Sequence, residues 1–473
     1  MPIKSRKRED IMNLLRTTGI VTSIKRVSGG ADLYTIINER SSVLVSSNLE
    51  MSLMERVDLQ YDESFKVSGI EPNGNADPEL YGRTLSALVN GIGVKAKAAG
   101  IDFGVIEITE KDKLKSALAD AAESLLTAYI TGAPLIVRFH NDGDGSSGAL
   151  ALYRALTKIG AGTFEGGRSA SWFMNKSIAY TPDSAYSDSA LISQYSSKEK
   201  PVLLITDFGT SEESSGGMEI IKAKADVIWL DHHMPYKGFS SEGARYINSW
   251  NFGSDSNMTA GALTSFLSQA LSGERFDELI KASFISDYSK YANPNDADAV
   301  RLATVLDYMT AKNKNGLSPK QIETVISDPD KYISTHATAT EQMEEAISLG
   351  VNTANKYLTD RGVQVFIVDF TPIADKEQGF PLPGRYSSRL QGRLEELNGE
   401  RVITAVHFGN FISMRVSKAI SAEVEILQVI ERLKRSNPEI GGGGHAEAAS
   451  IRVVNKNIKE ALTLLLIELG ARQ

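Results

Sequence analysis

Short apolar runs separated by amphipathic segments dominate the middle of the chain. PLIVRF at 134–139, VLLIT at 202–206 and VIWL at 227–230 are typical of buried parallel strands, since they are apolar almost throughout. Segments with helical character, 145–158 and 214–225, separate them. This alternation predicts an α/β domain with a doubly wound parallel sheet, which has helices on both faces.

The chain before this domain is β-rich and then helical. Between residues 18 and 70, TGIVTSIKRV, LYTII, SVLVS and SFKVSGI are short β-branched or alternating runs, and Gly29-Gly30 marks a hairpin turn. Turn residues Pro72-Asn73-Gly74-Asn75 end this stretch, which predicts a small barrel or sheet. A short helix is expected at 6–16, and an amphipathic helix at 112–130.

The C-terminal part predicts a second domain behind a helical connector. Residues 297–358 are charged, mostly helical in pattern and without a strand signal. From 363 onward, FIVDF, VITAVHF, FISMRV and ASIRVV predict strands, whereas 421–435 and 457–469 predict helices. A smaller α/β or α+β domain is therefore expected at the end of the chain.

Composition narrows the class of protein. The chain has 473 residues and a mass of 51.3 kDa, enough for two to four domains that each bury a core. No run of 18 apolar residues predicts a membrane span, and the start MPIKSRKRED has no apolar core of a secretory signal. The absence of Cys excludes thiolate chemistry and suits a cytoplasmic protein.

Charge gives a weaker indication of a nucleic-acid partner. The net charge of −8 excludes a global basic field. Residues 1–26, however, carry seven Lys and Arg against Glu9 and Asp10, so that 7 − 2 leaves a local charge of +5.

Acidic and imidazole side chains follow three of the predicted strands. After these strands come the following residues: His140, Asp142 and Asp144; Asp207; Asp231, His232 and His233. Carboxyl ends of parallel strands meet at the crevice where open α/β sheets bind ligands. Several carboxylates can share a crevice only if cations offset their repulsion. Oxygen and imidazole ligands favour a divalent metal, manganese or magnesium.

Two other interpretations of these acids exist. Asp and Gly are common caps and turn residues at strand ends, but three of only six His fall in these segments. A calcium loop in DGDGSSGALALY is excluded because its sixth position is Ser147 and its twelfth is Tyr153.

A glycine run near the C-terminus is a candidate anion site. Gly441 to Gly444 precede His445, and such a run lets backbone N–H groups approach an anion. A flexible linker is the alternative, but the strand-like AASIRVV that follows favours a tight loop inside a domain. Arg415 lies on an expected strand with Ser413 and Ser417 on the same face, a pattern that suits a phosphate clamp or a solvated strand equally.

Together these motifs resemble the DHH phosphoesterase superfamily. HNDGDG, TDFGTS and DHHMP resemble its first three motifs, Ile285-Ser286-Asp287 its fourth, and GGGGH with AEAAS its associated C-terminal domain. The resemblance covers about 133–290 and 360–470. It is greatest to archaeal RecJ-like single-strand nucleases of the GINS-associated type. Manganese-type pyrophosphatases lack the GGGGH domain. The first motif begins with His140 where the bacterial RecJ form has Asp, a pattern shared with archaeal relatives and small oligonucleotide phosphodiesterases.

The resemblance implies four segments. They are an OB-like nucleic-acid-binding β-barrel module at 1–75, a DHH domain at 82–296, a helical connector at 297–358 and a DHH-associated domain at 359–473.

It also implies a role for each candidate residue. One metal ion would be held by His140, Asp142 and Asp207, and the other by Asp144, Asp207, His232 and Asp287. Asp231 would orient His232, and His233 would face the substrate phosphate. The phosphate-binding residues would be Arg415, Ser413, Gly442, Gly443, Gly444 and His445.

Three functions remain open at this stage. The first is a metal-dependent exonuclease on single-stranded DNA or RNA in DNA repair or replication. The second is a phosphodiesterase of short oligonucleotides or cyclic dinucleotides. The third is a replication scaffold bound to GINS or the helicase with little activity; the retention of all six candidate metal ligands argues against it.

Overall fold

The computed structural model describes residues 16–28, 30–61, 67–165, 170–236, 238–313, 316–377, 379–444, 446–454 and 457–472. The chain forms two compact units. The first comprises Met1–Leu306 and Asn315–Ser327, and the second comprises Asp307–Lys314 and Asp328–Gln473. In the described part of the chain, no helix has the length and apolar character needed to cross a membrane.

A five-stranded parallel sheet forms the centre of the first unit. Its strands are β6 (Leu135–His140), β8 (Ser171–Asn175), β10 (Val202–Thr206), β11 (Asp226–Asp231) and β12 (Ala244–Asn248). Their order across the sheet is β12-β11-β10-β6-β8, and every neighbouring pair is parallel. Numbered along the chain the order is 2-1-3-4-5, so the direction of winding reverses between β6 and β10. Such a switch point is where doubly wound sheets bind ligands.

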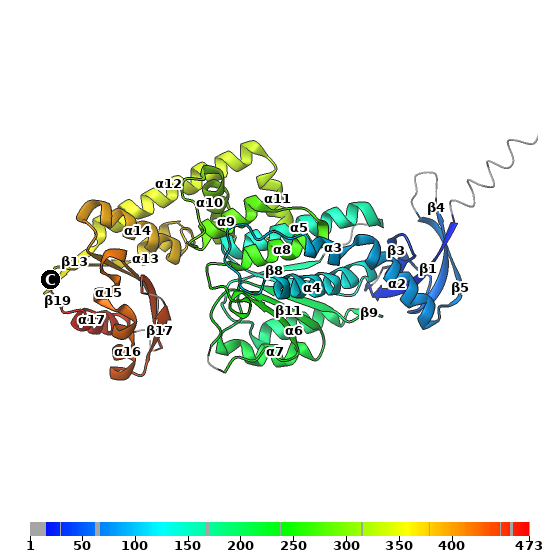
Figure 1. Ribbon diagram of the computed structural model, residues 1–473, viewed down its shortest axis with the longest axis horizontal. Helices are drawn as coiled ribbons and strands as arrows, with labels where there is room; N and C mark the ends of the chain where they lie inside the picture. The colour runs from blue at the N-terminus through cyan, green and yellow to red at the C-terminus, as the bar shows by residue number, and fades with distance from the viewer. Residues whose placement is uncertain are drawn as a thin grey trace, which may run out of the picture. The chain divides into compact units, whose positions relative to one another are not determined.

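Helices cover both faces of this sheet (Figure 1). On one face lie α4 (Lys111–Thr131), α5 (Gly143–Thr163) and α8 (Ala260–Ser272), and α8 packs against both of the others. On the other lie α6 (Pro182–Ile192) and α7 (Ser215–Lys222), whose apolar side chains share a core with the strands. The doubly wound α/β fold expected from the sequence is confirmed.

The N-terminal strands form a half-barrel that fits an OB-like module. β1 (Arg16–Lys25), β2 (Asp32–Ile37), β3 (Ser42–Ser47), β4 (Glu55–Tyr61) and β5 (Val67–Asn75) are antiparallel neighbours around an apolar core. Two short strands of the α/β domain join this sheet. β7 (Phe164–Glu165) pairs with β3, and β9 (Tyr195–Ser197) pairs with β1.

The end of β5 differs from the sequence expectation for this module. The segment Pro72-Asn73-Gly74-Asn75 is the end of β5 and not a closing turn, since its register shift against β4 accommodates Gly74 without leaving the sheet. The helix expected at 6–16 and Gly29 of the hairpin turn lie outside the described residues, except that Arg16 begins β1.

The remaining helices are divided between the two units. α2 (Pro78–Ile92), α3 (Val94–Ala99), α9 (Asp277–Ser286) and α11 (Pro319–Ile326) belong to the first unit, and α12 (Pro329–Thr353) belongs to the second. α10 (Ala297–Lys312) divides between them at Leu306. The described residues of 297–358 are mostly helical, as expected, apart from the loop before α11 and the start of β13.

The second unit is built on a seven-stranded sheet with an apolar core on each face. In sheet order the strands are β17 (Ile440–Gly444), β18 (Ala448–Val453), β16 (Phe411–Val416), β15 (Val402–Phe408), β14 (Gln364–Asp369), β13 (Asn355–Thr359) and β19 (Ala471–Arg472). Its helices are α13 (Thr371–Glu377), α14 (Pro383–Asn398), α15 (Ser421–Val424), α16 (Ile426–Ser436) and α17 (Ile458–Glu468).

The glycine run is a strand, which corrects the expectation of a tight loop. Gly441 to Gly444 lie in the edge strand β17 and pair with β18. A Cβ atom would lie 2.3 Å from the Ser450 carbonyl oxygen at Gly442, and 2.3 Å from that of Ala448 at Gly444. Glycine is therefore needed at these two positions for the close approach of the two strands.

Candidate active site

Three strand ends at the switch point carry the expected acidic cluster. β6 ends at His140, Asp207 directly follows β10, and β11 ends at Asp231. After β6 the chain turns at once into α5, and a Cβ on Gly145 would lie 2.6 Å from the His140 carbonyl oxygen. Glycine at this position permits the sharp turn that keeps Asp142 and Asp144 beside the strand end.

Asp207 lies at the centre of the cluster. One carboxylate oxygen, Oδ1, is 3.4 Å from Nε2 of His232, and the other, Oδ2, is 3.7 Å from Nδ1 of His140. The residue has a φ of 69°, a left-handed conformation that a non-glycine residue adopts at a cost of about 1 to 3 kcal/mol. This backbone conformation places one buried carboxylate between the imidazoles of His140, which ends β6, and His232, which follows β11.

His140 and Asp142 form the first half of the cluster. Nδ1 of His140 is 2.8 Å from Oδ2 of Asp142, whose Oδ1 accepts a hydrogen bond from the Gly145 amide at 3.0 Å. Burial favours the neutral forms of both groups, but their mutual attraction prevails. It raises the pKa of His140 and lowers the pKa of Asp142.

His232 is held so that one ring nitrogen faces the carboxylates. Nδ1 donates a hydrogen bond of 2.6 Å to the Ser256 carbonyl oxygen, which fixes the proton on that nitrogen. Nε2 then faces Asp207 and lies 3.8 Å from Oδ2 of Asp144. Nε2 of His232 and Oδ2 of Asp207 are buried, and neither has a hydrogen-bond partner among the described residues. Buried polar atoms without partners at converging ligands are what a metal ion would satisfy.

Asp144 is anchored by the start of α8. Its two carboxylate oxygens accept the Gly261 amide at 2.9 Å and the Ala260 amide at 3.1 Å. A Cβ on Gly261 would lie 2.6 Å from Asp144, so glycine allows the helix to come this close. Burial raises the pKa of Asp144, and the neighbouring carboxylate of Asp207 raises it further. A cation at this place would remove that repulsion.

Asp287 completes the cluster from the end of α9. Its Oδ2 is 3.6 Å from Nδ1 of His232, and its side chain is 40% exposed. The segment after it is tied to Asn257, whose carbonyl oxygen accepts from the Ser289 hydroxyl at 2.7 Å and whose Oδ1 accepts from the Lys290 amide at 2.6 Å. The 255–257 loop therefore holds both His232 and the Asp287 segment.

Ser256 and Asn257 are site residues that the sequence analysis missed. Ser256 acts through its main-chain carbonyl, and Asn257 through its carbonyl and side-chain amide oxygens. Nothing in the side-chain pattern of this loop signals such contacts, since a main-chain carbonyl carries no residue signature.

Asp231 orients the second His of the motif, not the first. Its buried carboxylate Oδ1 is 2.8 Å from Nδ1 of His233, and it contacts His232 only through the backbone amide. The expectation that Asp231 orients the His232 ring is therefore wrong, because Ser256 occupies that ring nitrogen. His233 is 54% exposed, with its other nitrogen away from Asp231.

The cluster offers two overlapping groups of metal ligands. The ligand atoms within each group lie within 4.8 Å of one another: His140, Asp142 and Asp207 form one group; Asp207, Asp231, His232 and His233 form the other. Both groups contain Asp207. Carboxylate oxygens and imidazole nitrogens without sulfur suit divalent ions such as manganese and magnesium.

The expected phosphate-binding residues lie on the sheet of the second unit. Ser413 on β16 and Gly443 on β17 both pair with Ser450 of the intervening β18, so these three residues form a row across the sheet. Arg415 Nε donates to the Ser388 hydroxyl at 2.8 Å, and its Nη2 donates to the Gly384 carbonyl at 3.2 Å. These bonds hold the guanidinium at the start of α14.

Ser413 itself is buried and shares a hydrogen bond of 2.9 Å with the Ser387 hydroxyl of α14. It therefore supports this part of the sheet. His445 lies outside the described residues.

Comparison with known proteins identifies the fold. No family model matches the sequence. The chain has the fold of DHH-domain proteins: it aligns with the DHH domain of a member of a ribosomal protein family with a TM-score of 0.67 and 20% identity, covering 83% of this chain and 99% of that one. RecJ of Thermus thermophilus in complex with Mn²⁺ aligns with a TM-score of 0.46 and 16% identity, covering 81% of this chain and 58% of that one.

A curated relative is longer than this chain. An uncharacterized protein of Methanocaldococcus jannaschii is 22% identical over 401 residues, which cover 72% of this chain and 52% of that protein. The chain thus spans about half the length of that relative. The resemblance to DHH proteins drawn from the sequence motifs is confirmed at the level of the fold.

Proposed function

We propose that the chain is a metal-dependent exonuclease that hydrolyses phosphodiester bonds of single-stranded nucleic acid, in DNA repair or replication. The observation that carries the proposal is the position of Asp207, whose two carboxylate oxygens face His232 and His140 from one buried, strained backbone position. That geometry suits a carboxylate that bridges two cations.

One ion would be held by His140, Asp142 and Asp207, whose ligand atoms lie together in the structure. The proposed second set is Asp144, Asp207, His232 and Asp287, in which Asp144 faces Nε2 of His232 and Asp287 faces Nδ1. Manganese fits this mixture of oxygen and nitrogen donors best, and magnesium is the alternative. Two such ions, when bound, activate a water at neutral pH and offset the charge on the phosphoryl oxygens of the substrate.

His233 is the proposed proton donor to the leaving group. Desolvation by the surrounding residues favours its neutral form, but the Asp231 carboxylate outweighs this effect and raises the pKa of His233. Because Asp231 accepts the Nδ1 proton, Nε2 is available to a substrate oxygen. Asp231 thus positions the ring and stabilises its charged form.

Substrate binding is proposed for two further surfaces. Arg415 and the backbone of Gly442 to Gly444, with His445, would hold a substrate phosphate, and Ser413 would support Arg415. The N-terminal half-barrel and its basic arm would contact the backbone of a longer strand. The proposed protein partner is GINS or the replicative helicase.

End-labelled single-stranded DNA and RNA, incubated with manganese or magnesium, test this proposal. We expect a product ladder that depends on metal, and Asp207→Asn should lower the rate at least about 100-fold because one carboxylate serves both ions. Asp226→Asn is the matched control. Asp226 begins β11, at the end of the strand opposite to Asp231, and forms an ion pair with Lys200.

Other outcomes would favour the alternatives. Cleavage of di- to tetranucleotides or cyclic dinucleotides without degradation of long strands would assign the chain to the short-substrate phosphodiesterases. No hydrolysis of any phosphodiester with either metal would contradict the enzyme and favour a scaffold role.

A further inference from the structure

A cavity of about 250 Å³ lies on the α7 face of the sheet, and parts of its lining follow the acidic cluster closely along the chain. Two segments of its lining begin shortly after residues of the cluster. Ser211 follows Asp207 by four positions, and Tyr236 follows His233 by three. With consecutive Cα atoms about 3.8 Å apart, Tyr236 lies at most about 11 Å from His233. The Tyr236 amide donates to the Thr210 carbonyl at 3.5 Å, which joins the two segments between the cluster and the cavity.

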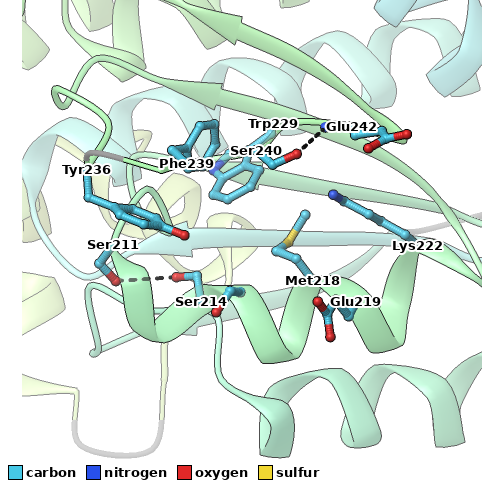
Figure 2. Close-up of a pocket in the computed structure, with 11 residues that line it drawn as sticks. Ser211, Ser214, Met218, Glu219, Lys222, Trp229, Tyr236, Phe239, Ser240 and Glu242 are labelled. Atoms are coloured by element: carbon cyan, nitrogen blue, oxygen red, sulfur yellow. Dashed lines mark hydrogen bonds between the residues drawn. The ribbon is translucent and has the colours of Figure 1, made fainter.

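One side of the cavity is aromatic. The Phe239 ring packs edge-to-face on Trp229 with centroids 5.1 Å apart, and on Tyr236 with centroids 6.0 Å apart. The indole N–H of Trp229 donates to the Phe208 carbonyl at 2.8 Å, which fixes the orientation of the ring. Figure 2 shows the three rings on one side and Met218 opposite them. A space lined by aromatic rings and a thioether suits a planar heterocycle.

The two ends of the cavity are polar. Ser211 and Ser214 lie at one end, and Lys222, Glu219 and Glu242 at the other; Figure 2 shows the Lys222 ammonium directed into the cavity. Among the described residues, none forms an ion pair with Lys222. One ammonium against two carboxylates leaves the lining with a net negative charge, which disfavours a phosphate. The same mixture of donors and acceptors matches the edges of a nucleobase.

We infer that this cavity is a nucleobase subsite, which takes the base of a nucleotide whose phosphate lies at the acidic cluster. The inference rests on the proposed function and adds a determinant of substrate binding to it. The base would stack on the Tyr236 ring, with Phe239 perpendicular to it at its edge, its acceptor atoms toward Lys222 and its donor atoms toward the carboxylates.

Kinetics of the full chain with manganese test the subsite. The substrates are dinucleotides that carry either a base or a tetrahydrofuran abasic residue at each position in turn. Tyr236→Leu removes the ring but keeps an apolar side chain, and we expect it to raise KM for the base-bearing dinucleotide about ten-fold more than for the abasic one. Lys224→Ala, an exposed lysine just beyond α7, is the matched control and should change neither value. An equal change for both substrates in Tyr236→Leu, or a wild-type enzyme indifferent to loss of either base, would overturn the inference.

A binding measurement separates this inference from the proposed function. Saturation-transfer NMR with adenosine 5′-monophosphate and magnesium follows binding without any phosphodiester to hydrolyse, and ribose 5-phosphate is the probe without a base. We expect transfer to the base protons that is reduced at least about five-fold in Tyr236→Leu and retained in Lys224→Ala. Base-proton transfer that is absent, or unchanged in Tyr236→Leu, would refute the subsite even if the chain hydrolyses nucleic acid. A chain that binds the base here but hydrolyses nothing would instead refute the exonuclease.

Discussion

At the residue scale, the acidic cluster depends on contacts from residues that are not themselves ligands. Asn257 holds the segment after Asp287, and the neighbouring Ser256 carbonyl holds His232. Groups that orient metal ligands in this way commonly contribute about 10- to 100-fold to metal affinity or activity.

We therefore expect Asn257→Ala to weaken manganese affinity about ten-fold, because the Lys290 amide loses its acceptor. Asn257→Asp retains an oxygen at this position and should restore most of the affinity. Calorimetric titration of manganese into each variant provides the measurement. Equal affinities in wild type and Asn257→Ala would exclude a positioning role.

A buried ion pair supports β6 just before the site. Nε and Nη2 of Arg138 donate to the Asp188 carboxylate at 2.8 and 2.7 Å. The Tyr180 hydroxyl donates to the same carboxylate at 2.8 Å. Asp188→Ala leaves Arg138 buried without a counter-charge. It should lower the free energy of unfolding by about 3 to 5 kcal/mol in urea denaturation.

The exposed pair Arg245–Asp226 in the same domain provides the comparison for Asp188. Arg245→Ala should cost at most about 1 kcal/mol. Similar losses in the two variants would mean that the buried network contributes no more than a surface pair.

At the element scale, glycines set how closely helices and strands approach the site. The start of α8 reaches Asp144 only because Gly261 has no Cβ. Gly261→Ala should therefore lower the melting temperature and weaken manganese binding. Gly82→Ala, inside α2 with nothing within 4 Å of the added carbon, should raise stability by about 0.5 to 1 kcal/mol. A stabilised Gly261→Ala variant would contradict the packing described here.

Two glycines of the edge strand β17 allow its packing and its proposed contact with substrate to be tested separately. An added Cβ meets the Ala448 carbonyl oxygen at Gly444 but meets nothing within 4 Å at Gly443. Gly444→Ala should lower stability, whereas Gly443→Ala should fold normally and raise KM about ten-fold if substrate phosphate approaches this backbone. An unchanged KM in Gly443→Ala would remove β17 from the substrate site.

Within the central sheet, the sequence predicted the inner strands and missed the outer ones. The inner strands β6, β10 and β11 are buried on both faces and read as apolar runs. β8 and β12, which were not predicted, are the outer strands of the same sheet and carry polar residues. Acids at strand ends were likewise visible, whereas contacts made through main-chain carbonyls were not.

At the scale of the whole molecule, the N-terminal half-barrel is part of the first unit. Thr22 and Ser42 donate side-chain hydrogen bonds to the carbonyls of Thr131 and Ile130 at the end of α4, and β1 and β3 pair with strands of the α/β domain. Its removal would expose these buried partners. We therefore expect deletion of residues 1–75 to destabilise the α/β domain, although the sequence predicts a module of its own at 1–75.

Deletion of residues 1–15 alone tests the nucleic-acid role of the basic arm. It removes four Lys and Arg and none of the described strands. Affinity for long single strands should fall and its dependence on salt should become shallower, as measured by fluorescence anisotropy, while the melting temperature stays unchanged. An unchanged salt slope would exclude this arm from nucleic-acid binding.

Manganese stoichiometry, measured by calorimetry on the full chain, tests the central claim most directly. If Asp207 bridges two ions at the switch point of the sheet, the wild-type chain and Asp226→Asn will each bind two manganese ions. Asp207→Asn will bind neither with comparable affinity. Two ions bound with unchanged affinity in Asp207→Asn, or none in the wild-type chain, would contradict the account.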